Sequence, residues 1–251
     1  MFVESYLKRI DYSGNISPSI ETLNKLHAHH LFNIPFENID IHIRKPLNLE
    51  KSKLYNKIIT NNRGGICYEL NGLFFHLLKS LNFKTWIISG RVFDKTKGYG
   101  PNYDHLALIV KIEEKEYLVD VGFGDFSLTP LIINSKAKNT NQTFIIDKLK
   151  ENYRVSKKTK RGIKPLYIFK KEEQKISNFL EMSLFHQTSS NSKFTQNLLI
   201  TIKTADGRDT ITNKIYKSKS RVNEVKEEIK TLSSFLEKLN NSFGISDIRL
   251  S

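Results

Sequence analysis

The chain has 251 residues, of which 39% are apolar and 26% are charged, enough for one large domain or two to three small ones around a buried core. Its single cysteine excludes an intrachain disulfide, and no apolar run approaches the roughly 20 residues that a membrane-spanning helix needs. The first residues, MFVESYLKRI, lack the basic-then-apolar layout of a signal peptide. We therefore expect a soluble protein of the reducing cytoplasm, without a membrane partner.

The net charge of +14 is concentrated in the second half of the chain. Residues 1–130 carry 16 Lys and Arg against 14 Asp and Glu, whereas residues 131–251 carry 24 against 12. Such a field attracts nucleic acid, a membrane surface or a phosphate-bearing small molecule, although a lysine-rich solvated surface is the simpler explanation. The densest cluster, KKTKRGIK at 157–164, has no interleaved aromatic residues to stack bases. We expect an exposed turn there and no nucleic-acid partner.

Two helices are predicted in the first third of the chain. The first runs from Ser17 to about Leu31, with Ser17 as its cap and Pro18 in its first turn. The second begins near Cys67, and its apolar positions are spaced alternately by three and one, which is a helical stripe. These positions are Leu70, Leu73, Phe74, Leu77, Leu78 and Leu81.

After Asn82 the sequence changes to short runs rich in β-branched and aromatic residues, which are typical of strands. The first three are KTWIISGRVF, HLALIVKI and EYLVDVGF, with EEK as a polar turn between the last two. Further runs are TFIID, NYRVS, LYIF and LLITIKT, and the Asp-Gly pair in TADGRDT predicts a hairpin. A closing helix is predicted from Val222 to Asn240, from the heptad-like spacing of Val225, Ile229, Leu232, Leu236 and Leu239. This order of elements indicates an α+β fold.

The only cysteine, Cys67, lies in NNRGGICYELNG directly behind a glycine pair. Gly64 and Gly65 permit unusual backbone conformations and the close approach of a partner, which suits a tight turn into the helix. Free backbone N–H groups and the helix dipole favour a thiolate at such a helix start. Cys67 is therefore a candidate nucleophile, although unpaired cysteines more often only fill space in a core.

A nucleophilic cysteine needs a base and a group that orients the base. His105 opens the strand HLALIVKI, and Asp120 stands between valines in the next strand. An ionised carboxylate in an apolar strand is costly unless it is paired, and an imidazole is a useful partner. A simple hairpin with its tip at 114–115, however, places Asp120 opposite Ile109, roughly 13 Å from His105. Direct contact then requires a bulge, strong twist or a different register.

The remaining six histidines are weaker candidates for the base. Three of them crowd one predicted helix with a spacing that suits metal ligands, but no cysteine or acidic cluster accompanies His27, His29 and His30. The others, which have no evident partner, are His42, His76 and His186. We predict no metal site and take His105 as the base.

Four motifs, in this order, resemble those of the arylamine N-acetyltransferases. They are IPFENI, RGGICYELNG, DHLALIV and YLVDVGFG, and FHQTSSNSKFTQNLLITIKT at 185–204 is similar to the family's later region. The resemblance implies an α+β fold with a cysteine-protease-like Cys-His-Asp core. It divides the chain into a helical domain with the nucleophile at 1–83, a central antiparallel β-barrel with the histidine and aspartate at 84–190, and a C-terminal α/β lid at 191–251.

The same resemblance implies a catalytic triad of Cys67, His105 and Asp120, in which His105 holds Cys67 as a thiolate and Asp120 orients the imidazole. Acetyl-CoA, a cosubstrate and not a tightly bound cofactor, acetylates Cys67. An arylamine, hydrazine or N-hydroxyarylamine then attacks the thioester. Backbone N–H groups near Cys67 are expected to stabilise the oxyanion.

Other positions carry over from the family as substrate contacts. Phe36 and Phe123 match aromatic positions of the acceptor pocket, with core packing as the alternative. Gly122 and Gly124 belong to a loop, 122–130, that matches the segment approaching the CoA pyrophosphate. A buried ion pair is expected to brace the site, formed by Arg63 and Glu37.

Three other functions stay open at this point. A thiol hydrolase or a transglutaminase-like acyl transferase uses the same order of Cys, His and Asp, and only the group that attacks the acyl-enzyme differs. The chain is alternatively a divergent member of the family that forms amides other than acetylated arylamines. A basic nucleic-acid-binding module is disfavoured, because neither a helix-turn-helix nor an aromatic-rich basic strand is present. The sequence indicates neither the acceptor amine nor the oligomeric state.

Overall fold

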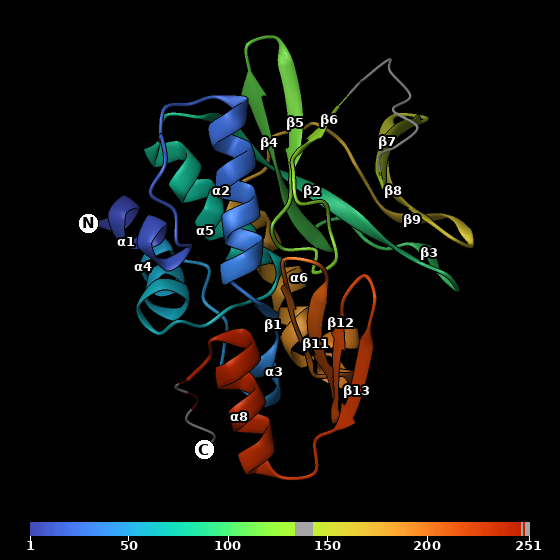
Figure 1. Ribbon diagram of the computed structural model, residues 1–251. Coiled ribbons are helices and arrows are strands. Elements are labelled where there is room, and N and C mark those ends of the chain that lie inside the picture. The colour runs from blue at the N-terminus through green and yellow to red at the C-terminus, as the bar shows by residue number, and fades with distance from the viewer. Residues whose placement is uncertain (134–142, 247, 249–251) are drawn as a thin grey trace.

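The computed structural model describes residues 1–133, 143–246 and 248, which form a helical region and two antiparallel sheets (Figure 1). The helical region comes first and includes a short strand and one π-helical turn. Its elements are α1 (Phe2–Arg9), α2 (Ile20–Asn33), β1 (Phe36–Glu37), α3 (Ile39–His42), α4 (Lys51–Tyr55), η1 (Asn56–Thr60) and α5 (Cys67–Ser80). Helices followed by antiparallel sheets place the chain in the α+β class, as predicted.

Helix α5 is at the centre of the first core. All residues of its predicted apolar stripe are buried, and Leu70 and Phe74 are completely inaccessible. The helix packs against the strands β2 (Lys84–Asp94) and β4 (His105–Ile112). Each buried leucine or phenylalanine contributes about 1.5–3 kcal/mol, so this face fixes the helix against the sheet. The predicted start of the helix at Cys67 is confirmed.

Helix α2 begins later than the sequence predicted. Ser19 is its N-cap, and the Ser19 side chain accepts a hydrogen bond from the Thr22 N–H at 3.1 Å. The predicted cap, Ser17, belongs to a preceding turn in which its N–H donates to the Asn15 side chain at 2.8 Å. The backbone at Ser17 is therefore held in this turn by the Asn15 side chain, and Pro18 lies before the N-cap instead of in the first helical turn.

The larger sheet has eight strands and curls into a nearly closed barrel (Figure 1). Its strands pair in the order β6-β5-β4-β2-β9-β8-β7, β3 pairs with β2, and the end strands β6 and β7 contact each other. The remaining bounds are β3 (Gly98–Tyr99), β5 (Lys115–Val119), β6 (Leu131–Ile132), β7 (Phe144–Leu149), β8 (Asn152–Thr159) and β9 (Gly162–Phe169). Inward-facing residues such as Ile109, Leu118, Phe126 and Tyr167 fill the barrel.

The hairpin of β4 and β5 has a different register from the predicted one. Ile109 pairs with Leu118 instead of Asp120. The tip is formed by residues 113–114, one position earlier than predicted, and the first of them has the positive φ, 53°, that a two-residue turn needs. This shift moves Asp120 past the end of β5, toward the end of β4 at which His105 lies.

The smaller sheet joins residues from both halves of the chain. Its strands pair in the order β1-β10-β11-β12-β13, and the predicted Asp-Gly hairpin connects β10 to β11. Helix α8 packs on this sheet through Leu239 and Phe243. The bounds are η2 (Ile176–Phe179), α6 (Leu180–Thr188), α7 (Lys193–Gln196), β10 (Leu199–Lys203), β11 (Arg208–Thr212), β12 (Ile215–Lys219), β13 (Glu224–Glu228) and α8 (Leu232–Phe243).

The predicted helix at 222–240 is wrong in its first half, which contains the strand β13. Helix α8 starts only after its N-cap Thr231, whose side chain accepts from the Ser234 N–H at 3.1 Å. The heptad-like spacing crossed this cap, so its first two apolar positions lie outside the helix. Strand pairing prevails because β13 extends an existing sheet, and an ion pair of 2.7 Å joins Glu224 to Lys217 across the strands.

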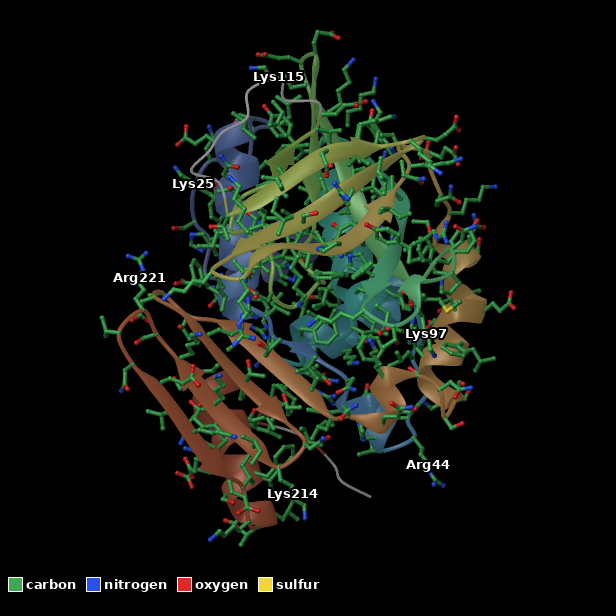
Figure 2. All side chains as sticks on the ribbon, turned by 90° about the vertical axis from the view of Figure 1, so that its right-hand side faces the viewer. Lys25, Arg44, Lys97, Lys115, Lys214 and Arg221 are labelled. Carbon is green, nitrogen blue, oxygen red and sulfur yellow. The ribbon has the colours of Figure 1, made fainter. Side chains whose placement is uncertain are left out.

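The basic side chains are spread over the molecule. Figure 2 shows Lys115, Lys214 and Arg221 at separate extremities, and all three are exposed. The densest basic cluster, at 157–164, belongs to the β8–β9 hairpin, and residues 159–162 are exposed at its tip. The predicted exposed turn is therefore confirmed.

The division of the chain at 1–83, 84–190 and 191–251 stays a prediction. The elements follow this order except for β1, which comes early in the sequence but pairs within the smaller sheet. None of the described helices combines the length and the apolar composition needed to cross a membrane.

Replacing Thr231 with alanine removes the oxygen that caps α8. We expect Thr231→Ala to lower the free energy of unfolding by about 1 kcal/mol, because the Ser234 N–H loses its acceptor. Thr231→Ser keeps the hydroxyl and is the matched control, expected to stay near wild type. Urea denaturation measures both, and equal stability of Thr231→Ala and wild type would contradict the role of the cap.

Candidate active site

Cys67 is the first residue of α5 and is 3% exposed. The two glycines before Cys67 allow other atoms to approach the backbone closely, and neither has a positive φ. A Cβ at Gly64 would lie 2.0 Å from the carbonyl oxygen of Pro35, and one at Gly65 would lie 2.7 Å from a carboxylate oxygen of Glu69. Gly64 therefore lets the turn before Cys67 pack against the chain that leads into β1, and Gly65 leaves room for the Glu69 side chain.

The three residues of the predicted triad come together. His105 Nε2 lies 2.7 Å from Asp120 Oδ2, and both side chains are almost completely buried. Since Nε2 faces the carboxylate, Nδ1 is the ring nitrogen left to face Cys67, whose sulfur also favours the charged form of His105. The predicted separation of roughly 13 Å is wrong, because the hairpin register is shifted and Asp120 lies beyond the end of β5.

The Asp120 carboxylate receives four hydrogen bonds and has no exposed surface. Oδ2 accepts from His105 at 2.7 Å and from the Tyr167 hydroxyl at 2.8 Å. Oδ1 accepts from Asn71 Nδ2 and from the Gly122 N–H, both at 3.0 Å. Burial raises the pKa of Asp120, but the charge of His105 and the hydrogen bonds outweigh it and lower the pKa below its ordinary value. The carboxylate is therefore ionised and fixed in orientation.

His105 is stabilised in its charged form by the groups on either side. Burial by itself lowers the pKa of the imidazole, but Asp120 and Cys67 together raise it to about 10. An imidazolium beside a cysteine sulfur is the state in which the base has taken the thiol proton. The arrangement therefore suits nucleophilic chemistry at neutral pH.

Asn71 supports the site but was not predicted from the sequence. Besides its bond to Asp120, its Nδ2 donates to the Leu106 carbonyl at 2.7 Å, and its Oδ1 accepts from the Val121 N–H at 2.9 Å. Asn71 thus joins α5 to β4 and to the segment after β5. One signal was available, since Asn71 is a polar residue one helical turn after Cys67 on a helix of largely apolar character. Tyr167 carried no comparable signal in its strand.

The three crowded histidines of α2 face different partners. His27 Nε2 lies 3.2 Å from the Asp120 carbonyl oxygen, and His27 Nδ1 lies 3.0 Å from the Leu128 carbonyl oxygen. His29 contacts the Ile10 carbonyl, whereas His30 contacts the hydroxyl of a buried tyrosine. Within the described ranges, no group of three His, Cys, Asp or Glu side chains is arranged to hold a metal ion.

The two predicted aromatic contacts have different neighbours at the candidate site. Phe123 stands edge-on to His105, with ring centroids 5.2 Å apart, and also contacts Tyr167. Phe36 is buried, forms a bridge with Gly65 in the turn before Cys67, and packs near Phe194. Phe123 therefore borders the His105 ring directly, whereas Phe36 borders the glycine pair.

The loop after Asp120 begins against Cys67 and then borders a pocket. A Cβ at Gly122 would lie 2.7 Å from the Cα of Cys67, so only glycine fits there. Gly124 has a φ of 81°, which other residues rarely adopt. Residues 125–131 line a pocket of about 350 Å³ together with Lys157 and Lys203.

Three cations and one carboxylate meet beside this pocket, and we call them the basic pocket cluster: Asp125, Lys157, Lys203 and Arg208. Asp125 pairs with Lys157 and lies 3.6 Å from Arg208 Nη2. Arg208 Nη1 donates to a threonine hydroxyl, while the buried Nη2 has no hydrogen-bond partner within the described part of the chain. The surplus of positive charge favours an anionic ligand.

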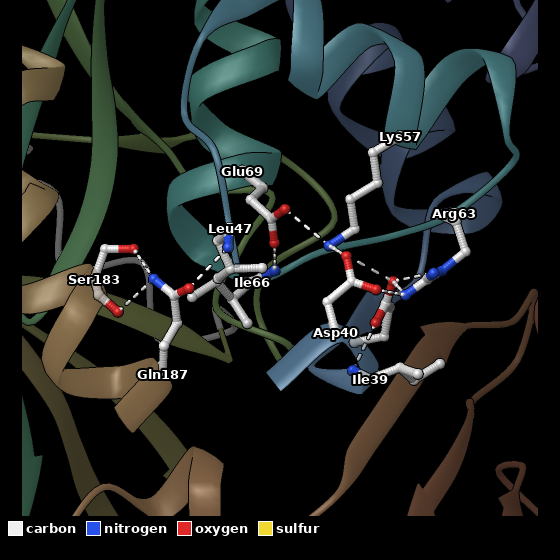
Figure 3. Close-up of polar contacts among 10 residues, drawn as sticks. Ile39, Asp40, Leu47, Lys57, Arg63, Ile66, Glu69, Ser183 and Gln187 are labelled. Carbon is white, nitrogen blue, oxygen red and sulfur yellow. Dashed lines mark hydrogen bonds and ion pairs between the residues drawn. The ribbon is translucent and has the colours of Figure 1, made fainter. Parts of the chain in front are cut away.

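A buried ion cluster lies beside the start of α5, around Glu69 (Figure 3). Its members are Glu37, Asp40, Lys57, Arg63 and Glu69. Lys57 Nζ lies 2.8 Å from Glu69, 3.0 Å from Asp40 and 4.0 Å from Glu37. Arg63 Nη2 lies 2.7 Å from Glu37 and 2.8 Å from Asp40. The predicted ion pair of Arg63 and Glu37 is confirmed.

The chain is similar to known N-acetyltransferases. A family model described as N-acetyltransferase matches residues 19–248. The arylamine N-acetyltransferase pineal gland isozyme NAT-10 of Gallus gallus is 30% identical, over 82% of this chain and 79% of that protein. The arylamine N-acetyltransferase structure from Salmonella typhimurium has a TM-score of 0.90 at 25% identity, covering 99% of this chain and 93% of that chain. The structure of the Mycobacterium marinum arylamine N-acetyltransferase in complex with CoA has a TM-score of 0.90 at 25% identity, covering 99% of this chain and 94% of that chain.

The contact between His105 and Asp120 makes stability depend on pH in a defined direction. In the folded protein the pKa of His105 is about 10, above the ordinary histidine pKa. The stabilisation that the His105–Asp120 pair gives the folded state is therefore complete below about pH 6.5 and is lost as the pH rises through about 10. We expect His105→Gln to lose most stability against wild type near pH 6, and the difference to narrow toward pH 10.

Urea denaturation of wild type and His105→Gln at several pH values measures this difference. His42→Gln is the matched control, because the His42 ring faces the Asn38 amide and not a carboxylate. A difference that widens from acidic to alkaline pH would contradict the assigned pairing.

Proposed function

Because the chain belongs to the arylamine N-acetyltransferase family, its activity is acetyl transfer from acetyl-CoA to arylamines, and we propose that Cys67 carries the acetyl group as a thioester. The observation that carries this proposal is the contact of His105 with Asp120, made directly beside the only cysteine. The transfer is then a double displacement, with acetyl-CoA as cosubstrate and without a tightly bound cofactor.

In the first half-reaction the thiol proton of Cys67 resides on His105, and the sulfur attacks the carbonyl carbon of the acetyl group. A bond forms between Cys67 Sγ and this carbon, and the bond between the carbon and the CoA sulfur breaks. His105 gives its proton to the departing CoA thiolate. Asp120 keeps the imidazole oriented throughout.

The tetrahedral intermediate of this step carries a negative oxygen that needs hydrogen-bond donors. The backbone N–H groups of Cys67 and Tyr68 stand in the first turn of α5 and have no acceptor among the residues that the structure describes. We assign these two groups as the donors, with the positive end of the helix dipole behind them.

In the second half-reaction the nitrogen of the acceptor attacks the acetyl carbon of the thioester. His105 takes a proton from the nitrogen, the bond between carbon and Cys67 Sγ breaks, and the N-acetylated product leaves. Aromatic walls favour a flat acceptor, and Phe123 and Phe36 are the side chains that we assign to this role. Arylamines, hydrazines and N-hydroxyarylamines are the expected acceptors.

We place the phosphates of CoA at the loop 122–130 and at the basic pocket cluster. Gly122 sets the start of this loop against Cys67, and Gly124 leaves room for a phosphate to approach the backbone. Positive charge beside the loop comes from Arg208, Lys203 and Lys157. Such a site orients the acetyl donor toward Cys67, because Gly122 packs directly against that residue. We further propose cytoplasmic action, where the thiol stays reduced, without a nucleic-acid or membrane partner.

Substitutions in the triad test the thioester. Cys67→Ala is expected to abolish acetyl loading, because the chain has no other cysteine. His105→Gln and Asp120→Asn are expected to slow loading on the order of 10³-fold. Intact mass after incubation with acetyl-CoA measures loading, and an aromatic amine should remove the adduct.

The control for this series is His76→Gln, which changes a half-buried histidine of α5 outside the triad. Normal loading in one of the triad variants would remove that residue from the mechanism. Release of free acetate without an N-acetylated product would instead favour a thiol hydrolase with the same three residues.

Substitution of Arg208 tests the placement of the CoA phosphates. Arg208→Gln is expected to raise the KM for acetyl-CoA about 3- to 10-fold and to weaken its dependence on salt. Turnover with p-nitrophenyl acetate, an acetyl donor without phosphates, should stay near wild type. Arg221→Gln, at an exposed site, is the matched control. Equal losses with both donors would contradict the placement.

A further inference from the structure

The buried ion cluster contains one more carboxylate than cations. Its two cations are not equivalent, because Arg63 is within ion-pair distance of Glu37 and Asp40 but not of Glu69. Across the described ranges, Lys57 is the one cation within 4.0 Å of the Glu69 carboxylate. The Lys57 side chain is 12% exposed and that of Glu69 is 1% exposed, so water does little to screen this pair.

Glu69 is bound to the backbone that leads into the nucleophile. Its Oε2 accepts from the N–H of Ile66, the residue before Cys67, at 3.0 Å, and its Oε1 accepts from Lys57 Nζ at 2.8 Å. Gly65 leaves the space that this carboxylate occupies. The Glu69 carboxylate therefore lies under the same turn that must accommodate a negative charge on Cys67. Burial raises the pKa of Glu69, whereas Lys57 and the Ile66 N–H favour its ionised form.

Lys57 reaches this position from the π-helical turn η1, a type of turn that is frequent at functional sites. Figure 3 shows its side chain extending toward Glu69 on one side and Asp40 on the other. The Lys57 carbonyl also accepts from the Arg63 N–H at 3.1 Å, at the residue that precedes the glycine pair. Both the backbone and the side chain of Lys57 thus support the segment before Cys67.

We propose that Lys57 is a positioning residue for acetyl transfer: it holds Glu69 against the turn before Cys67 and cancels the carboxylate charge that would otherwise oppose a thiolate. This inference rests on the proposed role of Cys67 as the nucleophile. Glu69 supplies the acceptor that the Ile66 N–H needs, but its charge is unfavourable beside a second anion. By pairing with Glu69, Lys57 reduces the repulsion between this carboxylate and a thiolate at Cys67, so Glu69 can still accept the hydrogen bond from the Ile66 N–H.

Two charge changes in the cluster are expected to act in opposite directions. Lys57→Met leaves Glu69 without its cation, so the thiolate of Cys67 should form only at higher pH. Glu69→Gln removes the negative charge and keeps a side-chain acceptor, so the thiolate should form at lower pH. The other titratable groups around Cys67, which are His105 with Asp120 behind it and Tyr68, are the same in every variant.

The pH dependence of Cys67 alkylation by iodoacetamide, followed by intact mass, measures this effect. We expect the midpoint to rise by about 0.5–1 pH unit in Lys57→Met and to fall by about as much in Glu69→Gln. The double variant has the same net charge as wild type and should return close to the wild-type midpoint, as should Lys57→Arg.

The matched controls are Lys25→Met and Glu21→Gln, which disrupt an exposed ion pair of 2.7 Å on α2 and should leave the midpoint unchanged. Alkylation needs no acetyl-CoA, so the result stands apart from acetyl loading, which tests the proposed function separately. Midpoints that move in the same direction in Lys57→Met and Glu69→Gln, or that do not move, overturn the proposal. If Lys57→Met does not fold, the other two variants test the proposal: the midpoint should fall in Glu69→Gln and return close to wild type in the double variant. Any other pair of results overturns the proposal.

Discussion

A carboxylate removed from water must be surrounded by donors, and Asp120 is the carboxylate that meets this condition at the candidate site. Its four donors come from α5, β4, β9 and the loop that follows β5. They converge only when the apolar face of α5 is packed on the barrel and the β4–β5 hairpin has its observed register. Leaving one partner of such a buried group unsatisfied costs about 1–3 kcal/mol, so the site and the core stabilise the same arrangement.

Cys67 lies between two buried charge systems that serve different ends. On one side, the ionised Asp120 holds His105 as an imidazolium, which favours a negative sulfur. On the other side, the buried ion cluster anchors the turn before Cys67 through Glu69. An acid that anchors backbone beside a nucleophile is useful only when its charge is balanced, and Lys57 provides that balance.

The smaller sheet reaches the site through β1. Phe36 pairs with Thr201 of β10 and also bridges Gly65, so the sheet is connected to the turn before Cys67. Through this connection Arg208 of β11 comes within ion-pair distance of Asp125 in the loop after the barrel strand β5. The basic pocket cluster and Cys67 are thereby positioned by segments that are far apart in the sequence.

Elements with a local signal could be predicted from the amino-acid sequence. The run HLALIVKI coincides with β4, α5 begins at Cys67, and the order of the motifs indicated the family and the three candidate residues. Tertiary structure decided the tip of the β4–β5 hairpin, the strand β13 in place of the first half of a helix, and the contacts of Asn71, Tyr167 and Lys57. The physical reason is that periodicity and capping depend on neighbouring residues. Register, buried hydrogen bonds and ion pairs depend on which distant segments meet, and packing of the whole core decides that.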